Sequence, residues 1–573
     1  MKIGIVFGCF IPLHSGHVSL INKSLSENDK TIIGVCGKDT DRGKDFIPFR
    51  VRLKLMQQKY QNDNIVVVPI DDGKLKLDGT FTHDNWIKWG NELFQNASIN
   101  PFDPNVEFTW YTGEPSYKEK LGNIYQNHKI ILIDRNINTV SGTKIRNNVN
   151  KYKDEIDKDF LNYINRRTKM KFKQMIESLL TQDLYKFSMG QAIYHQFPAY
   201  KTTWTFKCRN TDVKFTQEMV EEIKEQIQAY CQLQFTEDEL EYLDSIPWLK
   251  GSYIDFLRLW RPRYEDFEIT TDAKCGLAIE TRGTWLNTSM YEIPTLAIVN
   301  EVYFRMAYNY DELLTSFKER LDEKYDKLHK SIWYAGTFSE FGLRRRLSAE
   351  AQEMVVEKFS HLNDTMHSAS KFVGTSNVYL AKKFGVKPVG TMAHEWIMCA
   401  GQGNHKHNPA YSNWYALDAW VKEYGVLNGI ALTDTITTDC FLKDFQLTYA
   451  TLFSGVRHDS GDPYAWGDKI IKHYESLGID PKTKTLLFSD SLDFERADKL
   501  FRYFNPKTNV AFGIGTYLAN DTCVPPLNIV MKTTLCQGMP VAKISDVDGK
   551  GMCKDAEYVD YLKRTIQWRM NHE

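Results

Sequence analysis

The stretch GIVFGCFIPLHSGHVSLI, residues 4–21, joins an apolar run to a helical pattern through a turn that holds two histidines. The run before Gly8 predicts a buried strand, and the apolar residues after His17 recur at helical spacing. A helix start offers unpaired N–H groups and the positive end of the helix dipole, and Gly16 lets a ligand approach the backbone. We therefore predict a phosphate site at His14 and His17; the alternative is two turn histidines without a role.

Strand-like and helix-like patterns alternate through the first part of the chain. Further predicted strands are KTIIGVCG (30–37), NIVVVPI (64–70) and KIILIDR (129–135), and further predicted helices are FRVRLKLMQQKY (49–60) and NWIKWGNELFQ (85–95). Strands that alternate with helices form parallel βαβ units. The sequence therefore predicts an α/β domain over residues 1–168, with a doubly wound, Rossmann-like parallel sheet that ends in a polar connection.

The remaining residues, 169–573, are predicted to form a second α/β domain. They open with helical patterns, which we assign to an accessory N-terminal subdomain. Short apolar strands follow, each ending in polar or glycine-rich residues: VKPVGTMAHE, GIALTDTIT, TLLFSDSLD and VAFGIGT. Polar residues at the carboxyl ends of successive strands are typical of a β/α-barrel.

Composition limits the classes of partner. The 573 residues include 72 Lys and Arg against 73 Asp and Glu, a net charge of -1, which argues against a nucleic-acid or membrane surface. Ten cysteines without a CxxC pair indicate free thiols in a reducing cytoplasm rather than disulfides or zinc sites. No apolar stretch reaches membrane-spanning length, and the first residues do not resemble a signal peptide. We therefore expect a cytoplasmic protein with neither nucleic-acid nor membrane partners.

The residues around the first turn resemble the GxFxPxHxGH signature of the nucleotidylyltransferase superfamily. SGTKIR, residues 141–146, is similar to the S-x-T-x-I-R segment that holds ATP phosphates in that superfamily. The resemblance implies that ATP is bound by Gly8, Phe10, His14, His17, Ser141, Thr143 and Arg146. The two histidines would be catalytic, because they would stabilise charge as a nucleotide phosphate attacks the α-phosphate of ATP.

A narrower resemblance connects this domain with the NadR-type mononucleotide adenylyltransferases. It lies in RVRLKLMQQKY (50–60), in the segment with Trp86 and Trp89, and in YTGEPSYKEKLG (111–122). It implies that an aromatic side chain near Trp86 stacks on the pyridine ring of the mononucleotide. Simple helix-face packing of both tryptophans is an alternative of equal weight.

From Leu180 to about Asp555 the chain resembles bacterial nicotinate phosphoribosyltransferase nearly end to end. The matching motifs are LLTQDLYKFSMGQA, EFGLRRR, FVGTSNVYLAKKFG, GTMAHEW, LTDTITTDCFLKDF, GVRHDSGDP, KTLLFSDSLD, FGIGTYL and PLNIVMK. The resemblance implies an incomplete β/α-barrel that takes nicotinate and phosphoribosyl pyrophosphate (PRPP). Such a site needs a cation for the carboxylate, glycines for phosphates, and acids for hydroxyls or Mg²⁺. Mg²⁺ is the expected cofactor, although we assign no residue as a dedicated metal ligand.

The resemblance also distributes roles among the residues. Arg457 would bind the nicotinate carboxylate through paired hydrogen bonds, Tyr185 would stack on the ring, and Thr391 would line the pocket. The expected PRPP and phosphate ligands are Arg344, Asp459, Asp462, Gly513, Gly515 and Thr516. The two aspartates could instead hold a metal ion. Of the three arginines at 344–346, no more than one is expected to touch a ligand.

His394, in GTMAHEW, matches the histidine that is phosphorylated by ATP in this family, so ATP is expected as a substrate. A lone histidine is more often structural, and only the motif around His394 favours a catalytic role. Phosphohistidine formation would explain how ATP hydrolysis is coupled to an unfavourable glycosylation of a ring nitrogen.

The sequence thus predicts a bifunctional enzyme of NAD biosynthesis. The C-terminal domain would make nicotinate mononucleotide, and the N-terminal domain would adenylylate it to the dinucleotide. Nicotinamide mononucleotide is a second possible acceptor, which the NadR-type resemblance favours. The fusion of the two domains favours nicotinate mononucleotide, because the C-terminal domain would make it. The N-terminal domain could also be a nucleotide sensor or a transferase with an unrelated acceptor. The expected partners are small substrates, and the sequence leaves the oligomeric state open, a homodimer included.

Overall fold

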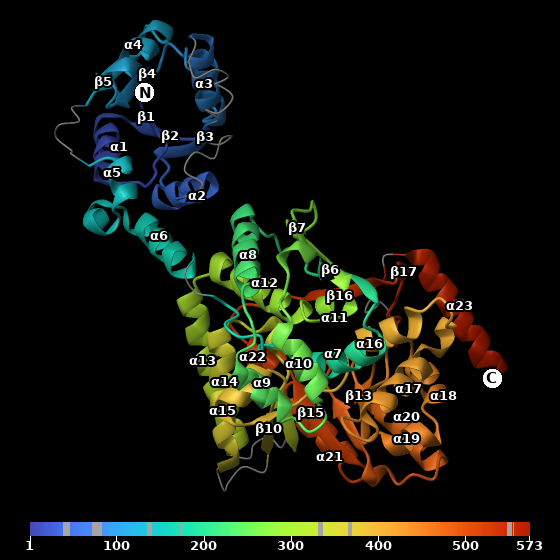
Figure 1. Ribbon diagram of the computed structural model, residues 1–573. Coiled ribbons are helices and arrows are strands. Elements are labelled where there is room, and N and C mark those ends of the chain that lie inside the picture. Colours follow the sequence, from blue (N-terminus) through green and yellow to red (C-terminus); the bar gives the residue numbers. More distant parts are fainter. Residues whose placement is uncertain are drawn as a thin grey trace. The chain divides into compact units, whose positions relative to one another are not determined.

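The computed structural model describes residues 1–37, 46–70, 83–133, 140–171, 174–330, 336–364, 370–546, 553 and 555–573. The chain divides into two compact units, Met1–Lys173 and Gln174–Glu573 (Figure 1). The boundary expected from the sequence, after residue 168, lies within α6 (Lys158–Lys171), the last helix of the first unit.

The first unit is built on a five-stranded parallel sheet in the order β3-β2-β1-β4-β5. Its strands are β1 (Lys2–Gly8), β2 (Lys30–Cys36), β3 (Ile65–Ile70), β4 (Glu107–Thr112) and β5 (Lys129–Leu132). Its remaining helices are α1 (Ser15–Glu27), α2 (Phe49–Lys59), α3 (His83–Asn96), α4 (Pro115–Ile124) and α5 (Gly142–Asn147). Alternate residues of β1 enter two separate apolar cores, Ile5 in one and Val6 in the other. Both sheet faces are therefore buried, which confirms the doubly wound α/β prediction.

The second unit contains a seven-stranded parallel sheet in the order β11-β10-β9-β15-β14-β13-β12. Its strands are β9 (Thr337–Glu340), β10 (Lys371–Thr375), β11 (Lys387–Pro388), β12 (Ile430–Leu432), β13 (Gly455–His458), β14 (Thr485–Phe488) and β15 (Asn509–Ile514). The first and last strands in sequence, β9 and β15, pair with each other, with Phe512 opposite Phe338. In a closed barrel β11 and β12 would also pair, but here they form the two free edges. The structure thus confirms the incomplete β/α-barrel.

Helices connect the successive barrel strands. They are α14 (Ala349–Ser360), α15 (Val378–Phe384), α17 (Ser412–Tyr424), α18 (Thr438–Asp444), α19 (Leu447–Leu452), α20 (Pro463–Ser476) and α21 (Phe494–Phe504). Several begin at a residue whose side chain accepts a hydrogen bond from the first turn, such as Ser348 before α14 and Asp493 before α21. These caps set the point at which each strand-end loop gives way to a helix.

An antiparallel sheet in the order β17-β16-β6-β8-β7 accompanies the barrel. Its strands are β6 (Lys201–Cys208), β7 (Phe267–Thr270), β8 (Ala278–Thr284), β16 (Ile529–Cys536) and β17 (Met539–Pro540). The remaining helices are α7 (Leu184–Gln196), α8 (Gln217–Tyr230), α9 (Glu237–Asp244), α10 (Gly251–Leu259), α11 (Trp285–Ser289), α12 (Glu292–Ala307), α13 (Tyr310–His329), α16 (His394–Trp396), α22 (Thr516–Ala519) and α23 (Ala556–His572). The sheet combines segments from both ends of the unit, because β16 pairs with β6 along its length. The accessory subdomain is therefore completed by residues near the C-terminus.

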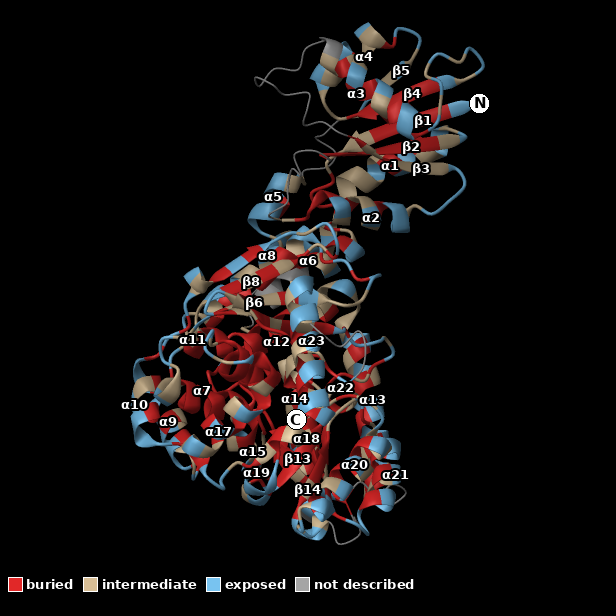
Figure 2. Cartoon of the chain, turned by 90° about the vertical axis from the view of Figure 1, so that its right-hand side faces the viewer, coloured by how far each residue is buried: buried red, intermediate tan, exposed pale blue. Residues whose placement is uncertain are grey.

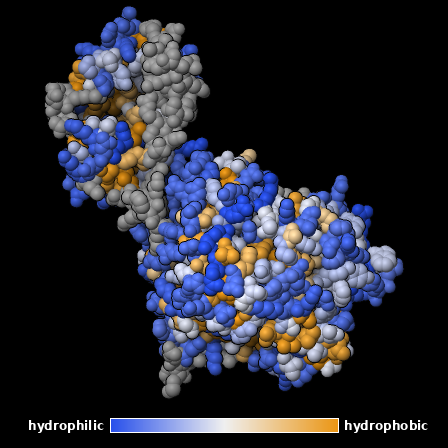
Figure 3. Space-filling view, in the orientation of Figure 1, coloured by the Kyte–Doolittle hydropathy of each residue, from blue (hydrophilic) through white to orange (hydrophobic). Residues whose placement is uncertain are grey.

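Burial concentrates on a few elements of the second unit. Helix α7 is buried at every position from Leu184 to Ile193, and β13 is buried throughout (Figure 2). Hydrophilic residues cover much of the face of this unit that Figure 3 presents. Among the described residues, no helix is long and apolar enough to span a membrane.

Candidate functional sites

In the first unit, the turn between β1 and α1 holds the two predicted histidines. His14 is the N-cap of α1, and its carbonyl oxygen accepts hydrogen bonds from the backbone N–H groups of His17 and Val18. The two imidazole rings lie 3.9 Å apart between centroids. Burial lowers the pKa of His14 to about 4, against the opposing effect of Glu155, so the ring is neutral near pH 7. Within the described part of the chain, its buried Nδ1 has no hydrogen-bond partner.

The second predicted motif packs against the same turn. Arg146 donates from Nη1 to the carbonyl oxygen of Ile11 at 2.9 Å and from Nη2 to Thr143 Oγ1 at 3.0 Å. A Cβ at Gly142 would lie only 2.8 Å from that carbonyl oxygen, so glycine permits the close approach. The Ser141 side chain caps α5 by accepting a hydrogen bond from Lys144 N. The structure therefore joins the two motifs, with Arg146 held by protein groups.

Two more predicted residues of this unit are buried. Phe10 is 1% exposed and has a φ of 48°, a left-handed conformation uncommon outside glycine. A Cβ at Gly8 would contact the ring of Phe10 at 3.5 Å. Trp86 is 5% exposed and packs edge-to-face against Trp89 and Tyr117, in one of the two apolar cores. This placement favours the packing interpretation of Trp86.

In the second unit, the predicted residues gather at the carboxyl ends of the barrel strands. His394 follows β11, Arg457 lies near the end of β13, and Asp459 comes directly after β13. Gly515 and Thr516 follow β15. Because parallel strands present their carboxyl ends at one edge, residues distant in sequence meet there.

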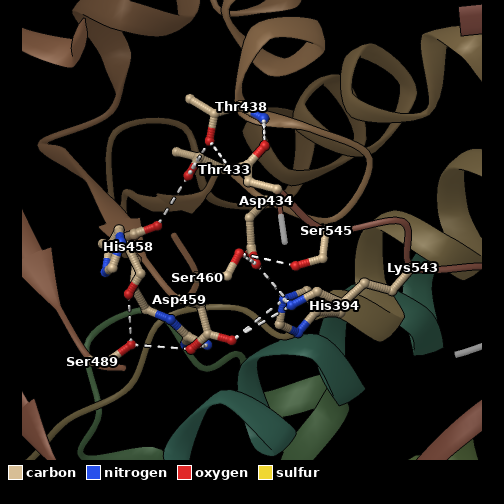
Figure 4. A network of polar contacts seen from close by, with 12 residues as sticks. His394, Thr433, Asp434, Thr438, His458, Asp459, Ser460, Ser489, Lys543 and Ser545 are labelled. Atoms are coloured by element: carbon tan, nitrogen blue, oxygen red, sulfur yellow. Dashed lines mark hydrogen bonds and ion pairs between the residues drawn. The ribbon is translucent and has the colours of Figure 1, made fainter. Parts of the chain in front are cut away.

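His394 lies at the centre of a polar network in this region (Figure 4). Its Nε2 lies 3.0 Å from Asp434 Oδ1, 2.7 Å from Lys543 Nζ and 3.5 Å from Asp459 Oδ2. Asp434 Oδ2 accepts from Lys543 Nζ at 2.8 Å and from Ser460 Oγ at 2.5 Å. Among the described residues, every hydrogen bond and ion pair of the His394 ring is made at Nε2, so Nδ1 is left without a protein partner.

The protonation states follow from burial and the neighbouring charges. Burial and then Lys543 lower the pKa of His394 to about 4, so the ring is neutral near pH 7. Burial alone would raise the pKa of Asp434, but His394 and Lys543 hold it well below its usual range. The site therefore presents a neutral imidazole beside an ionised carboxylate and a lysine.

Arg457 is close to this network. Its Nη1 donates to Thr391 Oγ1 at 2.7 Å and to the Met392 carbonyl oxygen at 3.2 Å, and its Nη2 donates to Asp459 Oδ1 at 3.3 Å. Its buried Nε has no hydrogen-bond partner among the described residues. A guanidinium with an unsatisfied buried N–H is suited to an anionic ligand.

Two neighbouring cavities complete the site. A small one, of about 50 Å³, is lined by Tyr185, Arg344, His394, Arg457, Asp459 and Lys532 among others. A larger one, of about 560 Å³, is lined by Arg344, Arg345, Asp459, Gly515, Thr516, Lys532 and Lys543 among others. Burial and then Lys543 lower the pKa of Lys532 to about 8, which reflects the crowding of cations here. The larger cavity is lined by five cationic side chains, Arg209, Arg344, Arg345, Lys532 and Lys543, and by five carboxylates, Glu292, Asp459, Asp490, Asp493 and Asp521. The cations are suited to phosphate groups, and the carboxylates to a metal ion or to hydroxyl groups.

The three consecutive arginines separate in the structure. Arg344 and Arg345 both line the larger cavity, and Arg345 also bonds the Ile529 carbonyl oxygen. Arg346 is 3% exposed and donates to the Met175 carbonyl oxygen, so it supports the protein interior. Arg344 and Arg345 therefore both face the cavity, and the expectation that no more than one of the three arginines touches a ligand stays a prediction.

Two of the predicted ligands lie outside the residues that line these cavities. Asp462 is exposed and accepts a hydrogen bond from Ala465 N as the N-cap of α20. Gly513 packs against the ring of Phe341, which a Cβ would approach to 2.3 Å. In the structure Asp462 caps a helix and Gly513 allows close packing of an aromatic ring, and their expected roles as ligands stay predictions.

The structure also adds residues that sequence reasoning misses. Asp434 follows β12 in GIALTDTIT, and the strand-end signal that singles out Asp459 applies to it equally. Lys543 follows β17 of the accessory sheet, and Lys532 belongs to β16. Lys532 is the last residue of the PLNIVMK motif, which gave no role to its side chain, and no quoted motif contains Lys543. Both lysines come from the accessory sheet, in which β16 pairs with β6.

The expected cofactor, Mg²⁺, fits this donor set in part. His394, Asp434 and Asp459 each place one ligand atom within 4.8 Å of the others. Asp434 Oδ2 already accepts from Lys543, Asp434 Oδ1 lies 3.0 Å from His394 Nε2, and Lys543 lies between the carboxylates. Of these two aspartates only Asp459 lines the larger cavity, where it could hold Mg²⁺ together with phosphate oxygens of a substrate.

Comparison with known proteins assigns both parts of the chain. Residues 337–569 match the nicotinate phosphoribosyltransferase (NAPRTase) family, and residues 180–300 match the N-terminal domain of that family. Residues 5–148 match the cytidylyltransferase-like family. These matches confirm the expected union of a nucleotidylyltransferase-type domain with a nicotinate phosphoribosyltransferase.

Individual relatives agree. Nicotinate phosphoribosyltransferase 2 of Pseudomonas aeruginosa is 44% identical over 402 residues, which cover 69% of this chain and 98% of the relative. The enzyme of that name from Acidovorax sp. is 42% identical over 397 residues. A solved nicotinate phosphoribosyltransferase from Vibrio cholerae has a TM-score of 0.63 and 36% identity, covering 69% of this chain and 94% of its own. The chain therefore belongs to the nicotinate phosphoribosyltransferase family, with a cytidylyltransferase-like domain ahead of the family's own domains.

Proposed function

We propose that the second unit makes nicotinate mononucleotide from nicotinate and PRPP with the help of ATP, and that the first unit adenylylates this product. The observation that carries the proposal is that one small cavity is lined by Arg457, whose Nε has no hydrogen-bond partner, and by His394, whose Nδ1 has none among the described residues. The Arg457 guanidinium is suited to bind an aromatic carboxylate, and Nδ1 of His394 is suited to accept a phosphoryl group.

Nicotinate would lie against Tyr185 with its carboxylate on Arg457, since both side chains line the small cavity. PRPP would place its phosphates among the cations of the larger cavity. The ring nitrogen of nicotinate then attacks C1 of the ribose, and the bond from C1 to the pyrophosphate oxygen breaks. Mg²⁺, when bound, would neutralise part of the charge on the departing pyrophosphate.

His394 would couple this reaction to ATP. The tautomer that carries its proton on Nε2 donates to Asp434 Oδ1 and leaves the lone pair on Nδ1. Nδ1 attacks the γ-phosphorus, the N–P bond forms, the bond to the bridging oxygen breaks, and ADP leaves. Water later cleaves the N–P bond and releases phosphate. Asp434 would orient the ring and favour this tautomer.

In the first unit, the mononucleotide phosphate would attack the α-phosphorus of ATP and expel pyrophosphate. His14 and His17 lie at the start of α1, where ring and backbone N–H groups would face the added charge. The acid made by the second unit is the proposed acceptor, with nicotinamide mononucleotide as the alternative. The hydrogen bond from Arg146 to Ile11 holds the S-x-T-x-I-R segment against the histidine turn, so both catalytic motifs are present together. Their presence supports an enzyme over a sensor.

One incubation tests the proposal. The full chain is mixed with nicotinate, PRPP, ATP and Mg²⁺, and products are identified by mass. We expect nicotinate mononucleotide followed by nicotinate adenine dinucleotide. Formation of the mononucleotide alone would remove the proposed role of the first unit. If neither product forms, the role of the second unit is refuted, and added nicotinate mononucleotide then tests the first unit.

A competition decides the acceptor. Equal concentrations of nicotinate and nicotinamide mononucleotides are supplied with ATP, and the two dinucleotides are compared as a ratio of kcat/KM. An excess of nicotinate adenine dinucleotide supports the proposal. Excess of the amide dinucleotide would overturn the acceptor assignment and keep the adenylyltransferase.

A further inference from the structure

Lys543 has no role in the phosphorylation of His394 as proposed above, yet it makes the shortest hydrogen bond to the His394 ring among the described residues. It follows β17, and its side chain is 5% exposed. Its Nζ lies 2.7 Å from His394 Nε2 and 2.8 Å from Asp434 Oδ2. Lys543 also lines the larger cavity, beside Arg344 and Lys532. One ammonium group therefore touches both the reactive histidine and the space where phosphates would bind.

Lys543 and Asp434 compete for the same nitrogen. A neutral imidazole nitrogen has one in-plane position, which holds either a proton or a lone pair. Asp434 Oδ1 can bond only to the protonated form of His394 Nε2, and the Lys543 ammonium can bond only to the lone pair. The ring can therefore satisfy one partner at a time. A doubly protonated ring does not resolve the conflict, because it would offer Lys543 no lone pair and would place two cationic groups 2.7 Å apart.

The two arrangements differ in reactivity. With Lys543 bonded to Nε2 of His394, the proton lies on Nδ1 and neither nitrogen offers a free lone pair. With Nε2–H bonded to Asp434, the lone pair lies on Nδ1, which has no hydrogen-bond partner among the described residues. Lys543 can leave Nε2 and keep its bond to Asp434 Oδ2 if a polyanion in the cavity attracts its Nζ. Movement of one side chain would thus switch the tautomer.

We propose that Lys543 is a positioning residue that holds His394 in its unreactive tautomer and releases it when a polyphosphate enters the larger cavity. The inference rests on the proposed function of His394. Lys543 would then determine which phosphoryl donors can react with His394. ATP carries a polyphosphate that draws the lysine away, whereas a small donor such as acetyl phosphate reaches His394 without releasing it. Transfer from acetyl phosphate would form the same N–P bond and break the bond between phosphorus and the acetate oxygen.

The tautomer can be observed without any turnover. The protein is labelled with ¹⁵N-histidine, the His394 signals are assigned by their loss in His394→Gln, and the protonated ring nitrogen is identified. In the resting wild type we expect the proton on Nδ1, and on Nε2 after inorganic tripolyphosphate is added. A ring that keeps one tautomer throughout overturns the proposal, and this readout needs no variant of Lys543.

Two lysine variants sharpen the result. Lys543→Met should carry the proton on Nε2 even without tripolyphosphate. Lys532→Met is the matched control, because Lys532 lines the same cavity but, among the described residues, is not one of the hydrogen-bond partners of the His394 ring. It should bind tripolyphosphate more weakly and keep the resting tautomer of the wild type. The same tautomer in wild type and Lys543→Met contradicts the inference.

Donor selectivity gives the second readout. Acetyl phosphate should phosphorylate His394 roughly 10- to 100-fold faster in Lys543→Met than in the wild type, the effect of removing one charge-assisted hydrogen bond. Lys543→Arg, which keeps the charge and donors, should restore discrimination. Equal acetyl phosphate labelling in wild type and Lys543→Met overturns the proposal. Absence of ATP labelling in the wild type would instead refute the function proposed for His394, and the tautomer measurement would still decide the role of Lys543.

Discussion

The two units each place a neutral histidine at a strand end, but they surround it differently. Burial lowers the pKa of both His14 and His394 to about 4. His14 lies beside a second imidazole, 3.9 Å away between ring centroids, whereas His394 lies 3.0 Å from the carboxylate of Asp434. A carboxylate partner orients a ring and selects its tautomer, which a nucleophile needs. Two adjacent imidazole rings at a helix start instead offer hydrogen-bond donors to a phosphate. The same residue type thus suits covalent catalysis in one unit and charge stabilisation in the other.

The largest expected effect tests the covalent half of this comparison. His394→Ala should lose all acid-labile labelling from γ-labelled ATP, because the phosphoryl acceptor is gone. His405→Ala, a change at an exposed histidine of the same unit, should label as the parent does. Adenylyl transfer by the first unit should be unchanged in both variants. Labelling that persists in His394→Ala would place the acceptor elsewhere.

Arg457→Ala should give the next largest effect. Leaving a buried carboxylate without its cation costs about 3–5 kcal/mol, which corresponds to a loss of roughly 200- to 5,000-fold in kcat/KM for nicotinate. The unmodified chain should use nicotinamide poorly for the same reason. Steady-state kinetics with both substrates measure the difference, and similar rates with nicotinate and nicotinamide would remove Arg457 from carboxylate binding.

His17→Ala tests the other half of the comparison. Loss of one donor to a developing charge typically costs about 10²–10³-fold, so adenylyl transfer should fall by that factor while nicotinate mononucleotide accumulates. Ser19→Ala, at an exposed position of the same helix, is the control. A matching fall in phosphoribosyl transfer would mean that the substitution damages more than the first site.

The pH dependence of labelling should separate a buried histidine from an exposed one. The pKa of His394 is lowered from 6.5 to about 4, so its ring stays neutral as the pH falls from 7 to 5. The labelling rate at saturating ATP should therefore be nearly constant over that range and decline only as pH 4 is approached. A decline with a midpoint near 6.5 would contradict the neutral, buried ring.

Separating the two units should have the smallest effect. Each has its own cores and its own motifs, so fragments 1–173 and 174–573 should fold and each keep its activity. Circular dichroism and the two assays check this. A fragment that unfolds or loses its reaction would show that the units depend on each other.

Much of the architecture follows from local patterns. Alternating apolar strands and helices predict both α/β units, and polar residues at strand ends predict the edge where His394, Arg457 and Asp459 meet. The same logic singles out Asp462, which in the structure is the N-cap of α20. An aspartate just before a helix can serve either use, and the sequence alone does not separate them.

By itself, then, the sequence determines the two fold classes, the histidine turn and the family motifs, because backbone periodicity and helix starts depend on near neighbours in the chain. Only the tertiary structure decides which charges surround each histidine. Lys543 lies 149 residues from His394, and Asp434 lies 40 residues from it. The strand order of the open barrel and the pairing of β16 with β6 bring these groups within hydrogen-bond distance. Tautomer and pKa respond to distances in space, so the chemistry of His394 is set by contacts that no local pattern contains.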